Sequence, residues 1–170
     1  MPRKFLVVVD DSPEFEAALR FACRRARSTG GRVVMLRVLP SNSDAHWSGA
    51  REEIERQQRD EAEALLNRLG VEAMDRSGAP AIFLIEKGEA QSAIKKVVGE
   101  DPDIKILVLA AGTGSRGPGP LISAIIKHGA ALGGRKLPVT IVPGELSETD
   151  IEDLAYLGAS PSAQFEGLVR

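Results

Sequence analysis

Five short runs of apolar residues constrain the fold of this chain more than any other feature of its sequence. Within each run the apolar residues follow one another almost without interruption, which is typical of strands buried on both faces of a parallel sheet. Segments with helical periodicity separate the runs, so strands and helices alternate along the chain. This order predicts an α/β fold with three layers, in which helices cover both faces of a five-stranded, mostly parallel sheet. The runs occupy residues 5–9, 33–39, 81–85, 106–111 and 138–142.

Serine, proline and glycine residues predict where the helices begin and end. Ser12 has the chemistry of an N-cap in front of Pro13, and the helix that follows is expected to end at Gly30. A long charged helix is expected over residues 50–69, with Gly70 as its end. The remaining helices are expected after Gly88-Glu89, over residues 121–132 and over residues 150–157.

The two ends of the chain differ in charge. The chain of 170 residues has a formal net charge of −2; residues 145–170 contain six acidic residues and one arginine and so carry −5, which leaves +3 for residues 1–144. We therefore expect a folded domain over residues 1–144 and an acidic extension with a short helix over residues 145–170. A domain so close to neutral lacks the cationic excess that nucleic-acid binding requires.

Other protein classes are disfavoured by what the sequence lacks. The single cysteine, Cys23, excludes an intrachain disulfide framework, and its place on the apolar side of a helix predicts a buried core residue. No apolar run approaches the roughly 20 residues of a membrane span, and the first residues lack the layout of a signal peptide, so we expect a cytoplasmic protein. The two histidines, His46 and His128, have no nucleophile motif around them, and we expect no enzymatic activity.

Asp10 and Asp11 follow the first strand, at the edge of the sheet where ligands of such folds bind. Asp10 either accepts a hydrogen bond from a base or a ribose, or only ends the strand and favours the next helix N-terminus. A metal site at this pair is disfavoured because no histidine or third acid stands at a supporting spacing.

A glycine-rich loop over residues 112–120 follows the fourth strand and precedes a helix. Its glycines allow the backbone to approach an anion, the helix N-terminus supplies amides, and Arg116 adds a cation for a phosphate. The loop lacks the Walker ending and the dinucleotide fingerprint, so the alternative is a flexible turn. In another loop, His46 and Trp47 either cover a site, contact a partner or anchor the loop against the sheet.

Several segments resemble the universal stress protein family. Residues 5–12 and 17–22 resemble the opening of these domains, as do residues 34–38, 88–90 and 138–142, so that the resemblance covers about residues 3–143. It implies a five-stranded parallel sheet of the adenine-nucleotide alpha-hydrolase-like type and a homodimer formed through the last strand. The chain looks most similar to a bacterial branch with Gly-Pro-Gly-Pro-Leu in the glycine-rich loop and an acidic C-terminal extension.

Many members of this family bind ATP through a pattern of Gly, two residues, Gly, nine residues, and Gly followed by Ser or Thr. Gly114 and Gly117 match its first half, but Lys127-His128 stands where Gly-Ser/Thr belongs. The missing glycine places side chains where the backbone would meet phosphate, whereas Lys127 itself offers a cation to a phosphate.

The family's adenine contacts fall on Asp10 and Val38. The nucleotide-binding residues implied by the resemblance are therefore Asp10, Val38, Gly114, Arg116, Gly117, Lys127 and His128.

The sequence thus predicts a non-catalytic cytoplasmic stress-response protein that acts as a homodimer, with ATP or AMP as the candidate ligand and Mg²⁺ only if ATP binds. The alternative, favoured by Lys127-His128, is a ligand-free protein–protein interaction module of the same fold, whose acidic tail docks on itself or on an unknown protein partner. A slow ATPase would need Asp10 or Asp11 to position a metal and water, and the loops supply no other general base.

Overall fold

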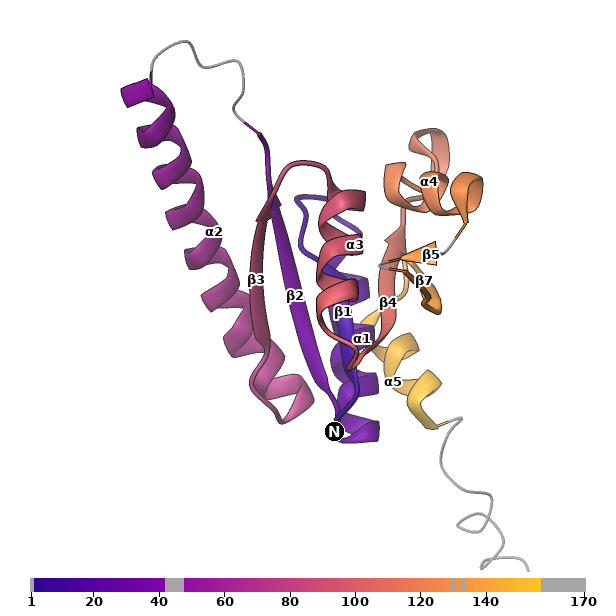
Figure 1. Ribbon diagram of the computed structural model, residues 1–170. Coiled ribbons are helices and arrows are strands. Elements are labelled where there is room, and N and C mark those ends of the chain that lie inside the picture. Colours follow the sequence, from indigo (N-terminus) through magenta and orange to yellow (C-terminus); the bar gives the residue numbers. More distant parts are fainter. Residues whose placement is uncertain (1, 42–47, 130, 133, 157–170) are drawn as a thin grey trace, which may run out of the picture.

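The computed structural model describes residues 2–41, 48–129, 131–132 and 134–156. Its main sheet has five parallel strands in the order β3-β2-β1-β4-β7, which confirms the predicted α/β class and the five-stranded sheet (Figure 1). A separate antiparallel pair, β5 with β6, was not predicted. The main strands are β1 (Lys4–Val8), β2 (Arg32–Leu39), β3 (Ile82–Lys87), β4 (Ile104–Ala111) and β7 (Val139–Pro143), and the small pair is β5 (Ala131–Leu132) and β6 (Arg135–Lys136).

Helices cover both faces of the sheet, and each face has its own apolar core. Neighbouring residues of β1 point to opposite faces: Val7 belongs to the core under α1 and α2, and Leu6 belongs to the core under α3 and α4. This double burial is the physical reason for the continuous apolar runs. The helices are α1 (Phe15–Thr29), α2 (Ser48–Ser77), α3 (Ala90–Glu100), α4 (Pro120–His128) and α5 (Glu148–Tyr156), with a 3-10 turn η1 (Gly114–Arg116).

The first helix begins later than the sequence predicts. Its N-cap is Glu14, not Ser12. The backbone N–H and the Oγ of Ser12 both donate to Oδ1 of Asp10, at 2.9 and 2.6 Å. Because Asp10 holds the Ser12 hydroxyl, that hydroxyl does not cap the helix, and the chain makes a turn before α1 starts.

The long helix α2 continues through Gly70 to Ser77, so the predicted end at Gly70 is wrong. A Cβ atom at position 70 would overlap the ring of Phe83 in β3. Gly70 therefore allows close packing between α2 and the edge strand rather than ending the helix.

The predicted helix over residues 121–132 is too long at its C-terminal end. α4 ends at His128, and the N–H of Gly129 closes the last turn by donating to the Ile125 carbonyl at 2.8 Å. β5 and β6 follow instead. From β6, Nη2 of Arg135 donates to the carbonyl oxygens of Val98, Asp101 and Ile104, at 3.1, 2.9 and 2.6 Å. Arg135 thus joins the end of α3 to the beginning of β4.

The described part of the acidic extension, residues 145–156, folds back onto the same chain, with α5 packed against α1 (Figure 1). Ser147 and Asp150 form a reciprocal cap: the Ser147 N–H donates to Oδ2 of Asp150, and the Asp150 N–H donates to Oγ of Ser147. Ile151 is 3% exposed, and Oε1 of Glu148 lies 2.5 Å from Nη1 of Arg76 on α2. The buried Ile151, the partly buried Leu146 and one ion pair therefore hold the described part of the extension.

The Glu148–Arg76 ion pair gives the position of α5 a predicted pH dependence. The hydrogen bond and charge of Arg76 hold the pKa of Glu148 below its ordinary value of 4.5. Because the pKa is lowered in the folded state, the stabilisation is complete above the unfolded pKa and is lost as pH falls through the folded pKa. We expect faster amide hydrogen exchange in α5 under acid and at high salt, after correction for intrinsic rates. Glu148→Gln should reduce this pH dependence and leave the part that comes from Asp150, whose pKa is lowered by its hydrogen bonds with Ser147. An unchanged profile would show that the ion pair with Arg76 does not hold α5.

Within the described residues, no helix has the length and apolarity needed to cross a membrane. His46 and Trp47, proposed above as a lid, a partner contact or a loop anchor, lie outside the described residues.

Candidate functional site

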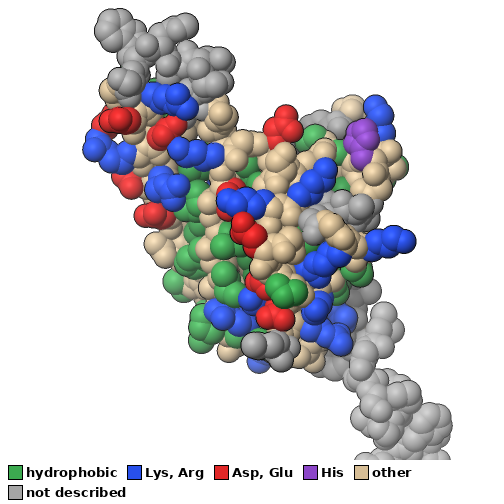
Figure 2. Space-filling model, in the orientation of Figure 1, with side chains coloured by type: hydrophobic (Ala, Val, Ile, Leu, Met, Phe, Trp, Pro, Cys, Tyr) green, Lys and Arg blue, Asp and Glu red, His purple; other side chains and the backbone are tan. Residues whose placement is uncertain are grey.

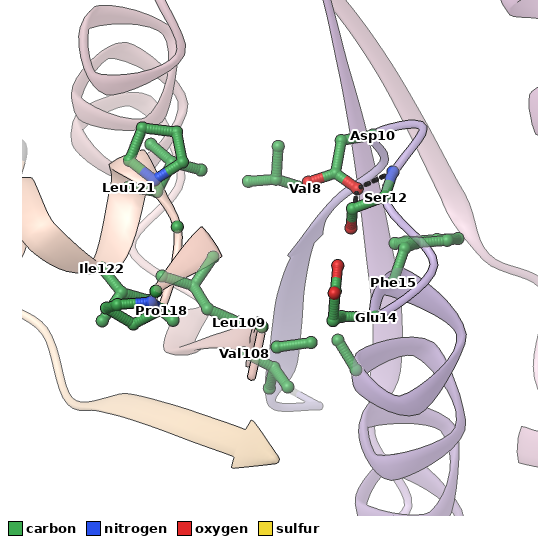
Figure 3. Close-up of a pocket in the computed structure, with 16 residues that line it drawn as sticks. Val8, Asp10, Ser12, Glu14, Phe15, Val108, Leu109, Pro118, Leu121 and Ile122 are labelled. Carbon is green, nitrogen blue, oxygen red and sulfur yellow. Dashed lines mark hydrogen bonds between the residues drawn. The ribbon is translucent and has the colours of Figure 1, made fainter. Parts of the chain in front are cut away.

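The strand order reverses at β1, which pairs with β2 on one side and with β4 on the other. At the carboxyl ends of β1 and β4 lies a cavity of about 240 Å³, which we call the switch-point cavity (Figure 3). This is the place where open α/β sheets bind their ligands.

Apolar side chains form most of the wall of the switch-point cavity. Val8 of β1 and Leu109 of β4 come from the sheet, and Leu121 and Ile122 come from the first turn of α4. In Figure 3 Val8 lies on the β1 side of this space, and Leu121 and Ile122 lie on the α4 side. Such walls suit a flat, largely apolar ring held between them.

Three polar side chains from the β1–α1 turn line the same cavity: Asp10, Ser12 and Glu14 (Figure 3). The two hydrogen bonds from Ser12 hold Oδ1 of Asp10. Among the described residues no other group bonds to Asp10, so Oδ2 remains as an acceptor. The turn therefore presents an oriented carboxylate oxygen, which suits a hydroxyl or amino donor on a ligand.

The glycine-rich loop forms the side of the cavity opposite Asp10. Gly117 and Gly119 both line it and have φ angles of 68° and 107°, which other residues rarely adopt. The Gly117 N–H donates to the Gly114 carbonyl at 3.2 Å, and the Gly112 N–H donates to the Pro118 carbonyl at 3.4 Å. These bonds close the loop on itself and bring its backbone to the start of α4.

The first turn of α4 supplies the amides that favour an anion. The first amides of a helix have no acceptor within the helix, and the helix dipole is positive at this end. Leu121 and Ile122 belong to this turn and line the cavity, whereas the Ser123 N–H already donates to the Gly119 carbonyl. A negatively charged group is therefore best placed between Gly117 and Ile122.

Sequence reasoning missed Glu14. Its carboxylate lies beside Gly112, since a Cβ atom at position 112 would be 3.2 Å from Oε1 of Glu14. In the sequence Glu14 is only an acid near a helix start, and nothing in the sequence shows that β4 ends beside it.

The structure brings some of the predicted nucleotide-binding residues together and separates others. Asp10 and Gly117 line the switch-point cavity, and Gly114 is hydrogen-bonded to Gly117. The backbone of Arg116 belongs to η1, and its side chain lies outside the described part of the structure. Val38 packs in the core under α3 and lines a different groove, beside Asp11 and α2. All of these nucleotide contacts remain predictions.

Lys127 and His128 lie in the last turn of α4, are exposed and do not line the switch-point cavity. The exposed histidine over α4 is visible at the surface in Figure 2. Lys127 and His128 stand at the negative end of the helix dipole. At a rise of 1.5 Å per residue they lie about 10 Å along α4 from its first residue. In this geometry the first turn of α4, and not Lys127-His128, is the end of the helix that faces the cavity.

Asp11 does not join Asp10. Its carboxylate lies 3.3 Å from Nη2 of Arg37, whose Nη1 donates to the Val9 carbonyl. The two aspartates thus have different neighbours, and the part of the chain that the structure describes contains no group of three metal-ligating side chains.

Cys23 is buried in the core under α1, as the sequence predicts. Burial raises the pKa of its thiol to about 12. The thiolate is therefore scarce at neutral pH, and the cysteine acts as a core residue.

Comparison with solved structures identifies the fold. A universal stress protein, UspA, from Lactobacillus plantarum matches 82% of this chain and 97% of its own chain, at 19% identity and a TM-score of 0.66. A universal stress protein in complex with cAMP matches 85% of this chain and 98% of its own, at 14% identity and a TM-score of 0.60. A universal stress protein from Archaeoglobus fulgidus in complex with dAMP matches 82% and 97%, at 21% identity and a TM-score of 0.55. At these identities the likeness shows the fold alone.

A search of curated proteins finds no match to this chain. The sequence model of the universal stress protein family matches residues 1–143, which is most of the chain and coincides with the sheet and its first four helices. The chain therefore belongs to the universal stress protein family.

Proposed function

We propose that this chain is a non-catalytic, cytoplasmic stress-response protein that binds an adenine nucleotide in the switch-point cavity. The observation that carries the proposal is the pair of opposite polar walls, Asp10 on one side and the glycine loop with the first turn of α4 on the other. The two relatives solved with cAMP and dAMP support the choice of an adenine nucleotide. Within the family we place the chain in the bacterial branch with the Gly-Pro-Gly-Pro-Leu loop and an acidic extension.

The geometry gives the nucleotide an orientation. The base packs between the neighbouring sheet residues Val8 and Leu109 on one side and Leu121 of α4 on the other, where the walls are apolar. A ribose hydroxyl donates to Oδ2 of Asp10, and the phosphate faces the backbone between Gly117 and Ile122. Each part of the ligand then meets a group of matching chemistry.

The size of the switch-point cavity favours AMP over ATP. Its volume of about 240 Å³ lies just below the roughly 300–1,000 Å³ usual for ligand pockets. A base, a sugar and one phosphate occupy it, whereas the further phosphates of ATP extend into solvent. Mg²⁺ is expected only as a companion of ATP, because its oxygen ligands would come mainly from the phosphates.

The nucleotide proposal is tested by isothermal titration of the purified chain with AMP and with ATP. Binding of AMP at least as tight as that of ATP is expected. If neither nucleotide gives a measurable heat of binding at millimolar concentration, the proposal is wrong. Mass spectrometry of small molecules released from protein purified without added nucleotide would show whether an adenine nucleotide is carried from the cell.

The homodimer is proposed to form through β7. This strand is the last in the order of the main sheet, so that its outer edge has no strand paired with it among the described residues. Ile141 in its middle is 44% exposed. An apolar edge strand with open backbone groups favours pairing with a second copy.

A charge on the open edge should break the dimer. Ile141→Asp is expected to convert the dimer to a monomer, because it puts an unpaired carboxylate into the interface. Ile126→Asp is the matched control, since Ile126 is exposed but lies on α4. Native mass spectrometry or analytical ultracentrifugation gives the masses. A wild-type chain that is monomeric at high micromolar concentration, or equal effects of the two variants, would refute this interface.

The second candidate function is a ligand-free interaction module that binds an unknown protein partner. The exposed Lys127-His128 at the far end of α4 favours it, because these residues give a phosphate no contact inside the cavity. It predicts no bound nucleotide after purification and loss of partner capture when Lys127 and His128 are replaced by alanine.

A further inference from the structure

A second cavity lies at the opposite end of the sheet from the switch-point cavity. It has a volume of about 290 Å³ and shares no lining residue with the switch-point cavity. Phe5 and Ile106 line it from the amino-terminal halves of β1 and β4, and Ile151 of α5 closes one side. We call it the α5 cavity.

The walls of the α5 cavity are largely apolar. Phe5 is 1% exposed, and Phe21 and Ile106 are partly buried members of the same core. Thr140 contributes the one hydroxyl of the lining. These walls favour the apolar body of a ligand.

Two cations, Arg24 and Arg25, are the only charged residues of this lining. Among the described residues no hydrogen bond or ion pair reaches either side chain, and Nε of Arg24 is buried without an acceptor. Arg24 also lines an adjoining groove between α1, α2 and α5. Two acids of that groove, Glu72 and Glu148, both pair with Arg76. Asp75 and Glu152 also line that groove and lie beyond ion-pair distance of Arg24.

A buried guanidinium N–H without a partner is rare in native proteins, because it has lost water and gained no acceptor. A carboxylate is the group that best satisfies it, since it accepts two parallel hydrogen bonds from one guanidinium. The Thr140 hydroxyl offers a further donor at the β7 wall.

We propose that the α5 cavity binds a small monocarboxylic acid with an apolar body. The carboxylate pairs with Arg24 and the body packs against Phe5 and Ile106. Because Ile151 forms part of the wall, the bound acid also contacts α5 and slows its detachment from α1. This proposal is independent of nucleotide binding in the switch-point cavity.

The test uses octanoate as the probe and 1-octanol as its neutral counterpart, added to the full chain. Isothermal titration should show octanoate binding at least tenfold more tightly than octanol. Arg24→Gln should weaken octanoate binding at least tenfold and leave the AMP titration unchanged. Arg27→Gln is the matched control, because Arg27 lies one turn further on α1 and lines the groove but not the α5 cavity. Thr140→Met, which fills the cavity from β7, should also weaken octanoate binding.

Thermal denaturation confirms that each variant is folded before the titrations are compared. The proposal is overturned if the wild-type chain does not bind octanoate at millimolar concentration, if octanol binds equally well, or if Arg24→Gln and Arg27→Gln behave alike. It is also overturned if Arg24→Gln changes the oligomeric mass while octanoate has no effect, since a second copy of the chain would then cover this face.

Discussion

Replacement of Asp10 by alanine is expected to weaken AMP binding by ten- to a hundredfold, with little change in the stability of the fold. A hydrogen bond to a charged group is worth about 1.5–3 kcal/mol, and each 1.4 kcal/mol is a factor of ten in affinity. The variant also frees Ser12, whose two hydrogen bonds orient the carboxylate, so the turn that lines the switch-point cavity loses its anchor. Isothermal titration with AMP measures the loss.

The neighbouring aspartate provides a matched control for this variant. Asp11 has the same side chain, but it is 86% exposed and pairs with Arg37 beside β2. Asp11→Ala should leave AMP affinity within a factor of two, since an exposed ion pair contributes little to the free energy. Equal effects of Asp10→Ala and Asp11→Ala would show that the ligand does not contact Oδ2 of Asp10.

Ser12→Ala separates orientation from contact. It removes the 2.6 Å hydrogen bond from Oγ while it leaves the carboxylate in place. We expect a smaller loss of affinity than for Asp10→Ala. A larger loss would mean that the Ser12 hydroxyl itself contacts the nucleotide.

Arg135→Ala is expected to lower the free energy of unfolding by about 2–3 kcal/mol. One terminal nitrogen of Arg135 donates hydrogen bonds to three carbonyl oxygens, those of Val98, Asp101 and Ile104. Hydrogen bonds to charged groups are worth about 1.5–3 kcal/mol, and the variant removes all three of these bonds. Urea denaturation followed by circular dichroism measures the change.

Two controls make the Arg135 result specific. Arg135→Lys keeps a cation but replaces the planar fork with a point charge, and should recover only part of the lost stability. Lys136→Ala removes the exposed neighbour in β6 and should change the free energy of unfolding by less than about 0.5 kcal/mol. If Arg135→Ala and Lys136→Ala are equally stable, the connection between β6 and α3 contributes nothing. AMP affinity should be unchanged in all three folded variants, because Arg135 does not line the switch-point cavity.

The layered α/β fold is predictable from the sequence because a strand that is buried on both faces is apolar at nearly every position. Residues 5–9 and 106–111 are apolar at nearly every position, and only a sheet covered by helices on both sides buries all of them. Alternation with helices then implies parallel strands, since each crossover returns the chain to the same end of the sheet.

Helix ends were harder to predict, because a single residue has competing uses. Gly70 looks like a helix end, but it contacts Phe83, thirteen positions away in another element. Ser12 looks like an N-cap, but its hydroxyl is held by Asp10. In both cases a tertiary or turn contact outweighs a weak local preference.

The sequence by itself determined the parallel sheet, and it indicated the carboxyl ends of the strands, with Asp10 and the glycine-rich loop, as the candidate place for a ligand. Only the tertiary structure decided which residues share a cavity. In the folded chain Glu14 lies beside Gly112, and Asp11 pairs with Arg37. Lys127 and His128 lie at the far end of α4 from the cavity.

The tertiary structure also docked α5 on α1 and left Arg24 unpaired in the α5 cavity. Sequence patterns could not predict these contacts, because local patterns of hydrophobicity and turn chemistry depend on the burial of each segment. These patterns do not depend on the distances between segments far apart in the chain, and those distances determine which residues line each cavity.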